Sequence, residues 1–418
     1  MPQALSASGP SGVVRIALAA FRWPLDPALA AGRDETTLAR ALYSTPLRTD
    51  SATGAVVPGL CTAWNASADF RRWTFTCRSA PSIAAALRRV TRLHDAQARW
   101  LFQDARITAP SAATLVIRLP YSWRRFPYAM TAVGTAPRFV PGPFELVSGT
   151  KRLVVLRREG LTLQFLRLPP RAAVRRFRQG ELDEAPVPLG DIAALKADLK
   201  IGRAVRARTL LGIDRVGIGG YSEQLRRTYW ETVNRGDYEE LIPELAGSAA
   251  YGFLGGEKRR PADFRRAVGG IRSLRPLPLW FNVPPDPALR YGARLLYAQW
   301  RDVGLGPIIL RSGPETKPNA GIERMLAAYP QEEAILAELV LRYEVGSREL
   351  LLRALSATRQ RPQLERLDDQ MRRRASAIPI AWVVDARLVS PRLEGWREDV
   401  LGNVDYAEVR SLASSRRP

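Results

Sequence analysis

The sequence predicts an α/β protein built from two or three lobes, and three observations support this fold class. The chain has 418 residues, which is enough for several units that each bury a core of their own. Apolar residues make up 46% of the chain and charged residues 25%, as in an ordinary globular protein. Strand patterns also alternate with helix patterns along much of the chain, which is typical of α/β proteins.

The first elements are a strand and a helix. We expect the strand over residues 13–18, and the Leu-Asp-Pro sequence at residues 25–27 interrupts extended structure. Asp26 is placed to cap the helix that follows, because its side-chain oxygen can accept from the free amides of a starting helix. We expect this helix to end near Tyr43. A polar turn at residues 51–54 then leads into a tight two-stranded unit.

This two-stranded unit carries the only two cysteines of the chain. Strand-forming residues lie on both sides of a polar tip at residues 67–69, and pairing Trp64 with Thr74 places Cys61 opposite Cys77. Directly opposite cysteines can form a disulfide if they occupy a non-hydrogen-bonded pair. The alternative is a pair of reduced thiols on neighbouring strands of an intracellular protein.

The following residues continue the alternation of helices and strands. We expect a short amphipathic helix at 84–90 and strands at 108–119, 151–158 and 161–168. A helix over residues 171–179 is opened by Pro170 and closed by Gly180, since proline suits the first turn and glycine the position after the last.

The remaining residues predict a larger α/β lobe. We expect helices at 226–241 and 287–303 and strands at 277–282, 307–310 and 378–384. The strand, helix and strand between residues 277 and 310 form a crossover that should be right-handed. Leu364, Leu367 and Met371 mark the buried face of a further helix.

Several segments in fixed order resemble a known family. LDPALA, LYSTPLRTD and VVPGLCTAWNASADFRRWTFTCR, within residues 25–78, resemble the opening of the family 5 extracellular solute-binding proteins, the peptide and oligopeptide receptors of ABC importers. GELD at residues 180–183 resembles a second element of that family, and the resemblance extends over roughly residues 13–410. It implies a two-lobed fold like that of the type II periplasmic binding proteins, with an extra small α+β subdomain.

The resemblance also implies the division of the chain into lobes. Residues 12–48, 139–212 and 386–418 would form lobe I, residues 49–138 the small subdomain, and residues 213–385 lobe II.

Charge and cysteine usage bear on partners and compartment. The formal net charge is +22, and the basic residues are spread along the chain instead of forming one block, so we expect no nucleic-acid partner. No apolar run reaches the ~20 residues that span a bilayer, and the first residues do not read as a secretion signal. The cysteine pair favours an oxidising compartment. We therefore expect an extracytoplasmic protein, in the periplasm or at the cell surface, whose signal segment is absent from this chain.

The sequence argues against an enzyme. His94 is the only histidine, so there is no histidine cluster for a metal and a single base for any nucleophile. His94 lies in a polar stretch, which favours a surface position. The paired carboxylates at 332–333 and 368–369 are consecutive and therefore point to different faces. We expect no cofactor and no metal.

Ligand recognition follows from the resemblance, with one departure. Peptide receptors of the family hold the free amine of the ligand with the aspartate of an ADYPDP element. The matching residues here read AAYPQE, so Ala328 stands at the aspartate position, and Glu332 or Glu333 is a possible substitute. The expected ligand contacts are Tyr43, Trp280, Asn282, Tyr329, Glu332 and Trp382. For Tyr329, Trp280 and Trp382, a plain core position is supported at least as well as a ligand contact, and for Trp382 the core position is favoured.

The function implied is that of a monomeric receptor. A peptide or peptide-like solute would bind in a cleft between the lobes and stabilise a closed state that docks on the membrane permease of an ABC importer. Two alternatives remain, namely a basic protein that binds polyanions or nucleic acid and a receptor-like scaffold that has lost its ligand.

Overall fold

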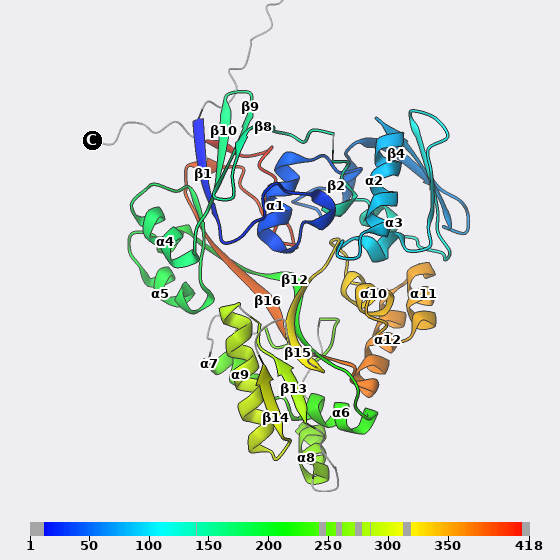
Figure 1. Ribbon diagram of the computed structural model, residues 1–418, viewed down its shortest axis with the longest axis vertical. Coiled ribbons are helices and arrows are strands. Elements are labelled where there is room, and N and C mark those ends of the chain that lie inside the picture. Colours follow the sequence, from blue (N-terminus) through cyan, green and yellow to red (C-terminus); the bar gives the residue numbers. More distant parts are fainter. Residues whose placement is uncertain are drawn as a thin grey trace, which may run out of the picture. The chain divides into compact units, whose positions relative to one another are not determined.

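The computed structural model describes residues 12–138, 140–241, 248–255, 261–271, 278–284, 286–311 and 319–411 (Figure 1). The chain forms two compact units. Unit 1 contains the described residues up to Tyr121, residues Arg125–Arg208 and those from Asp385 onward. Unit 2 contains Thr209–Val384 and the short segment Ser122–Arg124. None of the described helices is both long enough and apolar enough to cross a membrane.

Unit 1 is built around a mixed sheet. Its strands follow the order β8 (Glu145–Gly149), β9 (Leu153–Arg158), β10 (Leu161–Arg167), β1 (Gly12–Leu18), β11 (Glu184–Pro186) and the last residues of β16 (Ala377–Val389). β1 is parallel to both β10 and β11, whereas β8, β9 and β10 are antiparallel neighbours. β17 (Leu393–Glu394) and β18 (Arg410–Ser411) form a separate short pair.

Helices pack on both faces of this sheet. The helices of unit 1 are α1 (Gly32–Leu42), α2 (Ala80–Arg92), α3 (Phe126–Ala129), α4 (Pro170–Arg178) and α5 (Ile192–Ala197). Successive side chains of a strand point to opposite faces. Ile16 accordingly packs in one core together with Leu38 of α1, while its neighbour Ala17 packs in the other core together with Phe177 of α4.

The small subdomain that the family resemblance implies is present in unit 1. It is a four-stranded antiparallel sheet in the order β4 (Cys61–Ala66), β5 (Arg72–Cys77), β7 (Thr114–Arg118) and β6 (Arg106–Thr108). The strand expected over residues 108–119 is thus two strands joined by a turn, and the helix expected over 84–90 is the longer α2. β2 (Leu47–Thr49) and β3 (Val56–Pro58) flank the predicted polar turn.

The disulfide predicted between Cys61 and Cys77 is confirmed, and the two residues lie opposite each other in the register. The expected pairing of Trp64 with Thr74 is wrong by one residue. Trp64 instead faces Phe75, because the register shifts between Cys61 and Ala63. A β-bulge of this kind adds one unpaired residue to a strand, and periodicity alone does not reveal it.

The first helix begins later than the capping pattern predicts. Asp26 does act as a cap, since its Oδ1 accepts from the Ala28 amide at 3.1 Å, but the element that it caps is a short 3-10 turn over Pro27–Leu29. α1 starts at Gly32 and ends at Leu42, one residue before Tyr43. The segment after β1 is therefore a loop, and this loop shapes the candidate site.

Unit 2 holds the second set of strands. They follow the order β14 (Ile308–Arg311), β13 (Leu279–Asn282), β15 (Ala320–Leu326), β12 (Val205–Ile218) and β16. Its helices are α6 (Glu223–Thr232), α7 (Gly236–Leu241), α8 (Pro261–Gly270), α9 (Pro287–Asp302), α10 (Ala334–Leu341), α11 (Arg348–Ser356) and α12 (Arg361–Arg374). β13 and β14 are parallel, as the predicted crossover through α9 requires.

The single helix expected over residues 226–241 is wrong. It is divided into α6 and α7 by Val233, Asn234 and Arg235. The buried guanidinium of Arg235 donates from Nε and Nη2 to the carbonyl oxygen of Pro379 in β16, at 2.9 and 2.7 Å. These bonds pair the buried charge of Arg235 with a carbonyl oxygen of a distant strand. The helical pattern of residues 226–241 does not predict this pairing. By contrast, Leu364, Leu367 and Met371 of α12 are buried as expected.

Candidate ligand-binding site

The parallel strands of unit 1 end side by side. Leu18 at the end of β1 lies opposite Arg167 at the end of β10. In open α/β sheets, ligands bind in the crevice outside the carboxyl ends of the strands. The loop between β1 and α1 and the turn between β8 and β9 approach this edge. We therefore expect a ligand site here.

Two acidic residues in the first turn of α1 hold the loop after β1. Asp34 accepts through Oδ2 from the backbone amides of Ala19 and Ala20, at 2.6 and 3.1 Å. Glu35 accepts from the backbone amide of Arg22 at 2.9 Å and from its guanidinium at 2.8 and 2.6 Å. Burial alone would raise the pKa of Glu35, but the hydrogen bonds from Arg22 and from the Ala31 amide, together with the charge of Arg22, outweigh burial and hold the pKa below its usual value. Glu35 is therefore ionised and neutralised by Arg22.

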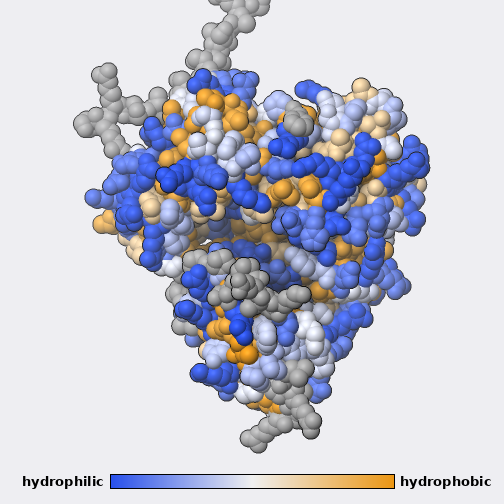
Figure 2. All heavy atoms as spheres, in the orientation of Figure 1, coloured by the Kyte–Doolittle hydropathy of each residue, from blue (hydrophilic) through white to orange (hydrophobic). Residues whose placement is uncertain are grey.

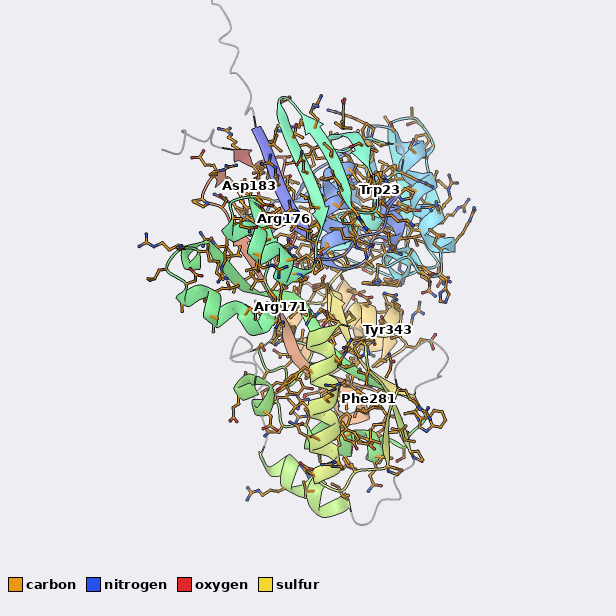
Figure 3. The ribbon with its side chains drawn as sticks, turned by 60° about the vertical axis from the view of Figure 1, so that its left-hand side comes forward. Trp23, Arg171, Arg176, Asp183, Phe281 and Tyr343 are labelled. Carbon is orange, nitrogen blue, oxygen red and sulfur yellow. A yellow bond between two sulfur atoms is a disulfide. The ribbon has the colours of Figure 1, made fainter. Side chains whose placement is uncertain are left out.

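Trp23 lies on the backbone of β8 (Figure 3). A Cβ atom added to Gly149 would lie 2.0 Å from Cζ2 and 2.3 Å from Cε2 of the indole. Only a glycine leaves room for the ring at this distance, because carbon atoms in contact are normally ~3.5–4.0 Å apart. Gly149 thereby allows a partly buried tryptophan to pack at the carboxyl edge of the sheet.

These elements line an open cavity of about 600 Å³ on the surface of unit 1. Its lining comes from the loop after β1, the first turn of α1, the turn between β8 and β9 and the end of β10, and consists of Ala20, Phe21, Arg22, Trp23, Ala31, Glu35, Lys151 and Arg167. This volume is within the range of small-molecule sites, and the mixture of aromatic and charged walls is typical of them.

The cavity carries unbalanced positive charge. Glu35 is its one carboxylate, and Arg22 already pairs with it. Lys151 and Arg167 are exposed, and neither pairs with a carboxylate in the described part of the chain. Two cations without a partner at the mouth of an aromatic-walled cavity favour a ligand with an anionic group.

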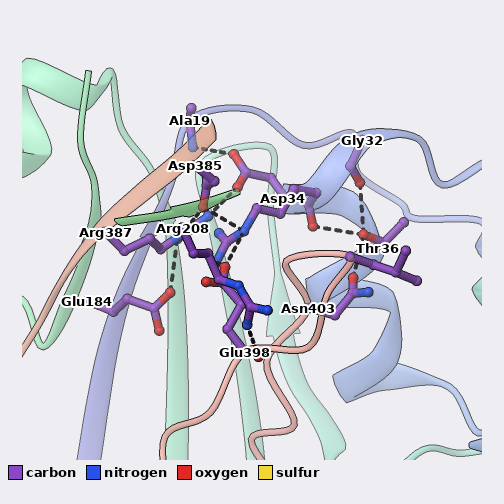
Figure 4. A network of polar contacts seen from close by, with 12 residues as sticks. Ala19, Gly32, Asp34, Thr36, Glu184, Arg208, Asp385, Arg387, Glu398 and Asn403 are labelled. Atoms are coloured by element: carbon purple, nitrogen blue, oxygen red, sulfur yellow. Dashed lines mark hydrogen bonds and ion pairs between the residues drawn. The ribbon is translucent and has the colours of Figure 1, made fainter. Parts of the chain in front are cut away.

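A buried network joins this loop to the return strand β16 (Figure 4). Asp34 pairs through Oδ1 with Arg387 at 2.7 Å, and Arg387 pairs with Glu184 of β11 at 3.0 Å. Arg33, next to Asp34, pairs with Asp385 at 3.0 Å. The loop that lines the cavity is thus fastened to two strands of the sheet, and several carboxylates balance the buried guanidinium groups.

Glu184 is fully buried in this network. Burial raises its pKa to about 7, although Arg33, the Tyr406 hydroxyl at 2.7 Å and the Trp396 indole N–H at 2.8 Å all favour the ionised form. A carboxyl group of this kind changes its charge near neutral pH.

The residues expected to contact the ligand lie in different places. Trp280 and Asn282 share one face of β13, and the Arg311 guanidinium lies 5.1 Å from the centre of the Trp280 ring. Trp280 is 39% exposed, so the structure brings a partly exposed aromatic, an amide and a cation together in unit 2. Trp382 is partly buried in β16. The ligand roles of Trp280, Asn282 and Trp382 stay predictions.

Tyr329 is fully buried, and its ring centre lies 5.9 Å from that of Trp123. Of the two alternatives for Tyr329, a core position and a ligand contact, the structure shows the core position, in unit 2. Glu332 pairs with Arg361 at 3.1 Å, and Glu333 is fully buried beside α10. Neither acid offers an exposed, unpaired carboxylate in place of the aspartate that Ala328 replaces.

Tyr43 lies in unit 1, where its hydroxyl donates to the carbonyl oxygen of Leu25 at 2.7 Å. It lines a second cavity and not the one beside Trp23. His94 is exposed, as its polar surroundings predict. No group of three His, Cys, Asp or Glu side chains in the described residues is placed to hold a metal ion.

Four residues of this cavity and its wall were not predicted from the sequence, namely Trp23, Gly149, Lys151 and Arg167. Lys151 and Arg167 fall within segments that were expected to be strands, and their position at strand ends was the available signal. That signal becomes useful only once the order and direction of the strands are known, since parallel pairing decides which ends meet.

Comparison with known proteins shows what the fold resembles. No protein-family model matches the sequence, and no curated protein matches it significantly. Among solved structures, the Escherichia coli murein tripeptide binding protein MppA superposes with a TM-score of 0.80 and 16% identity, covering 96% of this chain and 99% of MppA. Haemophilus influenzae OppA, solved with the peptide RPPGFSPFR, gives a TM-score of 0.81 and 15% identity over 96% of this chain and 99% of its own.

A third structure agrees with these two. DppA of Helicobacter pylori, in complex with the peptide STSA, matches with a TM-score of 0.79 and 14% identity over 97% of this chain and 99% of its own. The matches cover both units and nearly the whole length of each protein. The chain therefore has the α/β fold of the OppA- and DppA-type periplasmic binding proteins, as the sequence resemblance implied.

Proposed function

We propose that this protein is an extracytoplasmic receptor that captures a peptide or peptide-like solute and delivers it to the membrane permease of an ABC importer. The full-length fold match with three peptide-binding proteins carries the proposal. The disulfide between Cys61 and Cys77 supports an oxidising compartment. In this proposal the receptor acts as a monomer, and its closed, liganded state is the one that the permease recognises.

The charges of the cavity beside Trp23 favour a solute with a carboxylate. Lys151 and Arg167 have no carboxylate partner in the described residues, and guanidinium and ammonium groups bind carboxylates through charge-assisted hydrogen bonds. Recognition of the free amine at the other end of a peptide has less support, because Glu332 pairs with Arg361 and Glu333 is buried. We therefore propose that recognition depends on the carboxylate of the solute more than on a free amine.

The test is a thermal-shift screen with peptides, sugars, polyamines and metal chelates, followed by calorimetry on the ligands that stabilise the protein. A peptide that binds is then compared with its C-terminally amidated and its N-acetylated forms. We expect amidation to weaken binding about tenfold, since it removes a charge-assisted interaction, and acetylation to have a smaller effect.

Variants locate this binding. Lys151→Gln and Arg167→Gln should each weaken binding of the free peptide and have little effect on the amidated one. Lys200→Gln is the matched control, because Lys200 is exposed and lies outside the cavity. Stabilisation by polyanions alone, lost in high salt and without any response to small solutes, would contradict the receptor and favour a basic polyanion-binding protein.

A further inference from the structure

Unit 1 contains a second cavity, of about 340 Å³. It lies where the end of α1, the β2 and β3 pair and the loop over residues 399–407 meet. None of its lining residues lines the cavity beside Trp23. The two cavities are therefore distinct, and nothing in the proposed function requires the second.

Four arginines and two aspartates line this second cavity, and both aspartates are already engaged. Asp399 accepts from the backbone amides of Leu401 and Asn403, both at 2.9 Å. Asp405 pairs with Arg48 at 3.4 Å and accepts from the Ala407 amide at 3.0 Å. The carboxylates therefore offset only part of the positive charge.

The other three arginines have no carboxylate partner in the described ranges. Arg40 donates from Nη2 to the carbonyl oxygen of Thr131 at 3.4 Å, and Arg158 donates from Nη2 to that of Ala407 at 3.0 Å. Arg78 is exposed. Four guanidinium groups therefore share this cavity with only two carboxylates, so its lining keeps an excess of positive charge that a bound anion would offset.

The other lining residues are mixed: Leu60, Pro143 and Tyr43 are apolar or aromatic, and the rest include polar residues such as Ser44 and Asn403. We propose that this cavity is a second binding site, for a small molecule that carries a phosphate or carboxylate group. The planar guanidinium fork matches both oxyanions with paired hydrogen bonds. The apolar walls and the volume leave room for a small body attached to the oxyanion.

The experiment is calorimetric titration of the whole protein with inorganic phosphate and, separately, with succinate, at an ionic strength held constant with chloride. We expect saturable binding of one oxyanion per chain, and the stronger of the two ligands identifies the preferred group. Arg40→Gln, Arg78→Gln and Arg158→Gln should each weaken binding about tenfold, as expected for the loss of one charge-assisted hydrogen bond. Arg78 is exposed, so its variant folds even if a more buried one does not.

One further variant makes the test specific. Arg118→Gln changes an exposed arginine of β7 outside both cavities and should leave binding unchanged. An equal loss in Arg118→Gln, a response that follows ionic strength without saturation, or a loss caused only by Lys151→Gln would overturn the proposal.

Discussion

The contact between Trp23 and Gly149 gives the sharpest prediction about the candidate site. Gly149→Ala adds a single methyl group at a position whose backbone an alanine tolerates, since no left-handed φ occurs there. That methyl carbon would lie 2.0 Å from Cζ2 of the Trp23 indole. The ring must therefore retreat by about 1.5 Å or more to reach a normal contact distance.

The size of the effect follows from overpacking. Inserting one methyl group into an occupied site typically costs about 1–3 kcal/mol, and we expect the free energy of unfolding of Gly149→Ala to fall by that amount. Alanine also reduces the entropy of the unfolded chain, which offsets the loss by about 0.4–1 kcal/mol. Gly190→Ala measures this second contribution alone, because nothing lies within 4 Å of a Cβ atom at Gly190.

The assay is a double-mutant cycle by guanidinium unfolding, with Gly149→Ala made in the native protein and in a Trp23→Ala background. If the ring is the atom group that clashes, the cost of the added methyl disappears once the ring is removed, and the coupling energy is about 1 kcal/mol or more. The proposed solute should also bind more weakly to Gly149→Ala, because a wall of its cavity has moved. A cost no greater than that of Gly190→Ala, or the same cost in both backgrounds, would refute the contact.

The remaining predictions concern the disulfide and the buried carboxyl group. Replacing Cys61 and Cys77 with alanine opens a loop with a sequence separation of 16, which should lower the free energy of unfolding by about 3 kcal/mol; reductant should do the same to the native protein and nothing to the variant. Glu184, whose pKa burial raises to about 7, binds its proton more tightly in the folded state than in the unfolded chain. Its contribution to stability is therefore present at acidic pH and is lost as pH rises towards 7, and Glu184→Gln should flatten this part of the curve of unfolding free energy against pH. If Glu184→Gln kept the full slope of unfolding free energy against pH, the slope would belong to another titrating group.

The distribution of surface charge bears on the alternative of a polyanion-binding protein. Figure 2 shows hydrophilic residues scattered among hydrophobic ones over the face that it draws. Many arginines also have specific partners, such as Arg22 with Glu35 and Arg324 with Asp214. The unpaired arginines that matter for the proposals are those of the two cavities in unit 1.

The sequence by itself determined much of the local structure. The alternation of strand-forming residues around a polar tip predicted a hairpin that places Cys61 opposite Cys77, and the apolar spacing of Leu364, Leu367 and Met371 predicted the buried face of α12. Proline at the start and glycine after the end delimited α4 within one residue. These predictions succeed because each depends on residues close together in the chain, where backbone geometry sets the pattern.

Only the tertiary structure decided the features that involve distant residues. The bond from Arg235 to a carbonyl of β16 divides a helix that periodicity predicts to be continuous. The cavity beside Trp23 exists because β1 and β10 pair in parallel, which brings the loop after one strand to Arg167 at the end of the other. The need for a glycine at position 149 follows only from the position of the Trp23 indole, which is distant in sequence. The physical reason is that side-chain pattern fixes which face of an element is buried, whereas strand order and register fix which distant residues meet.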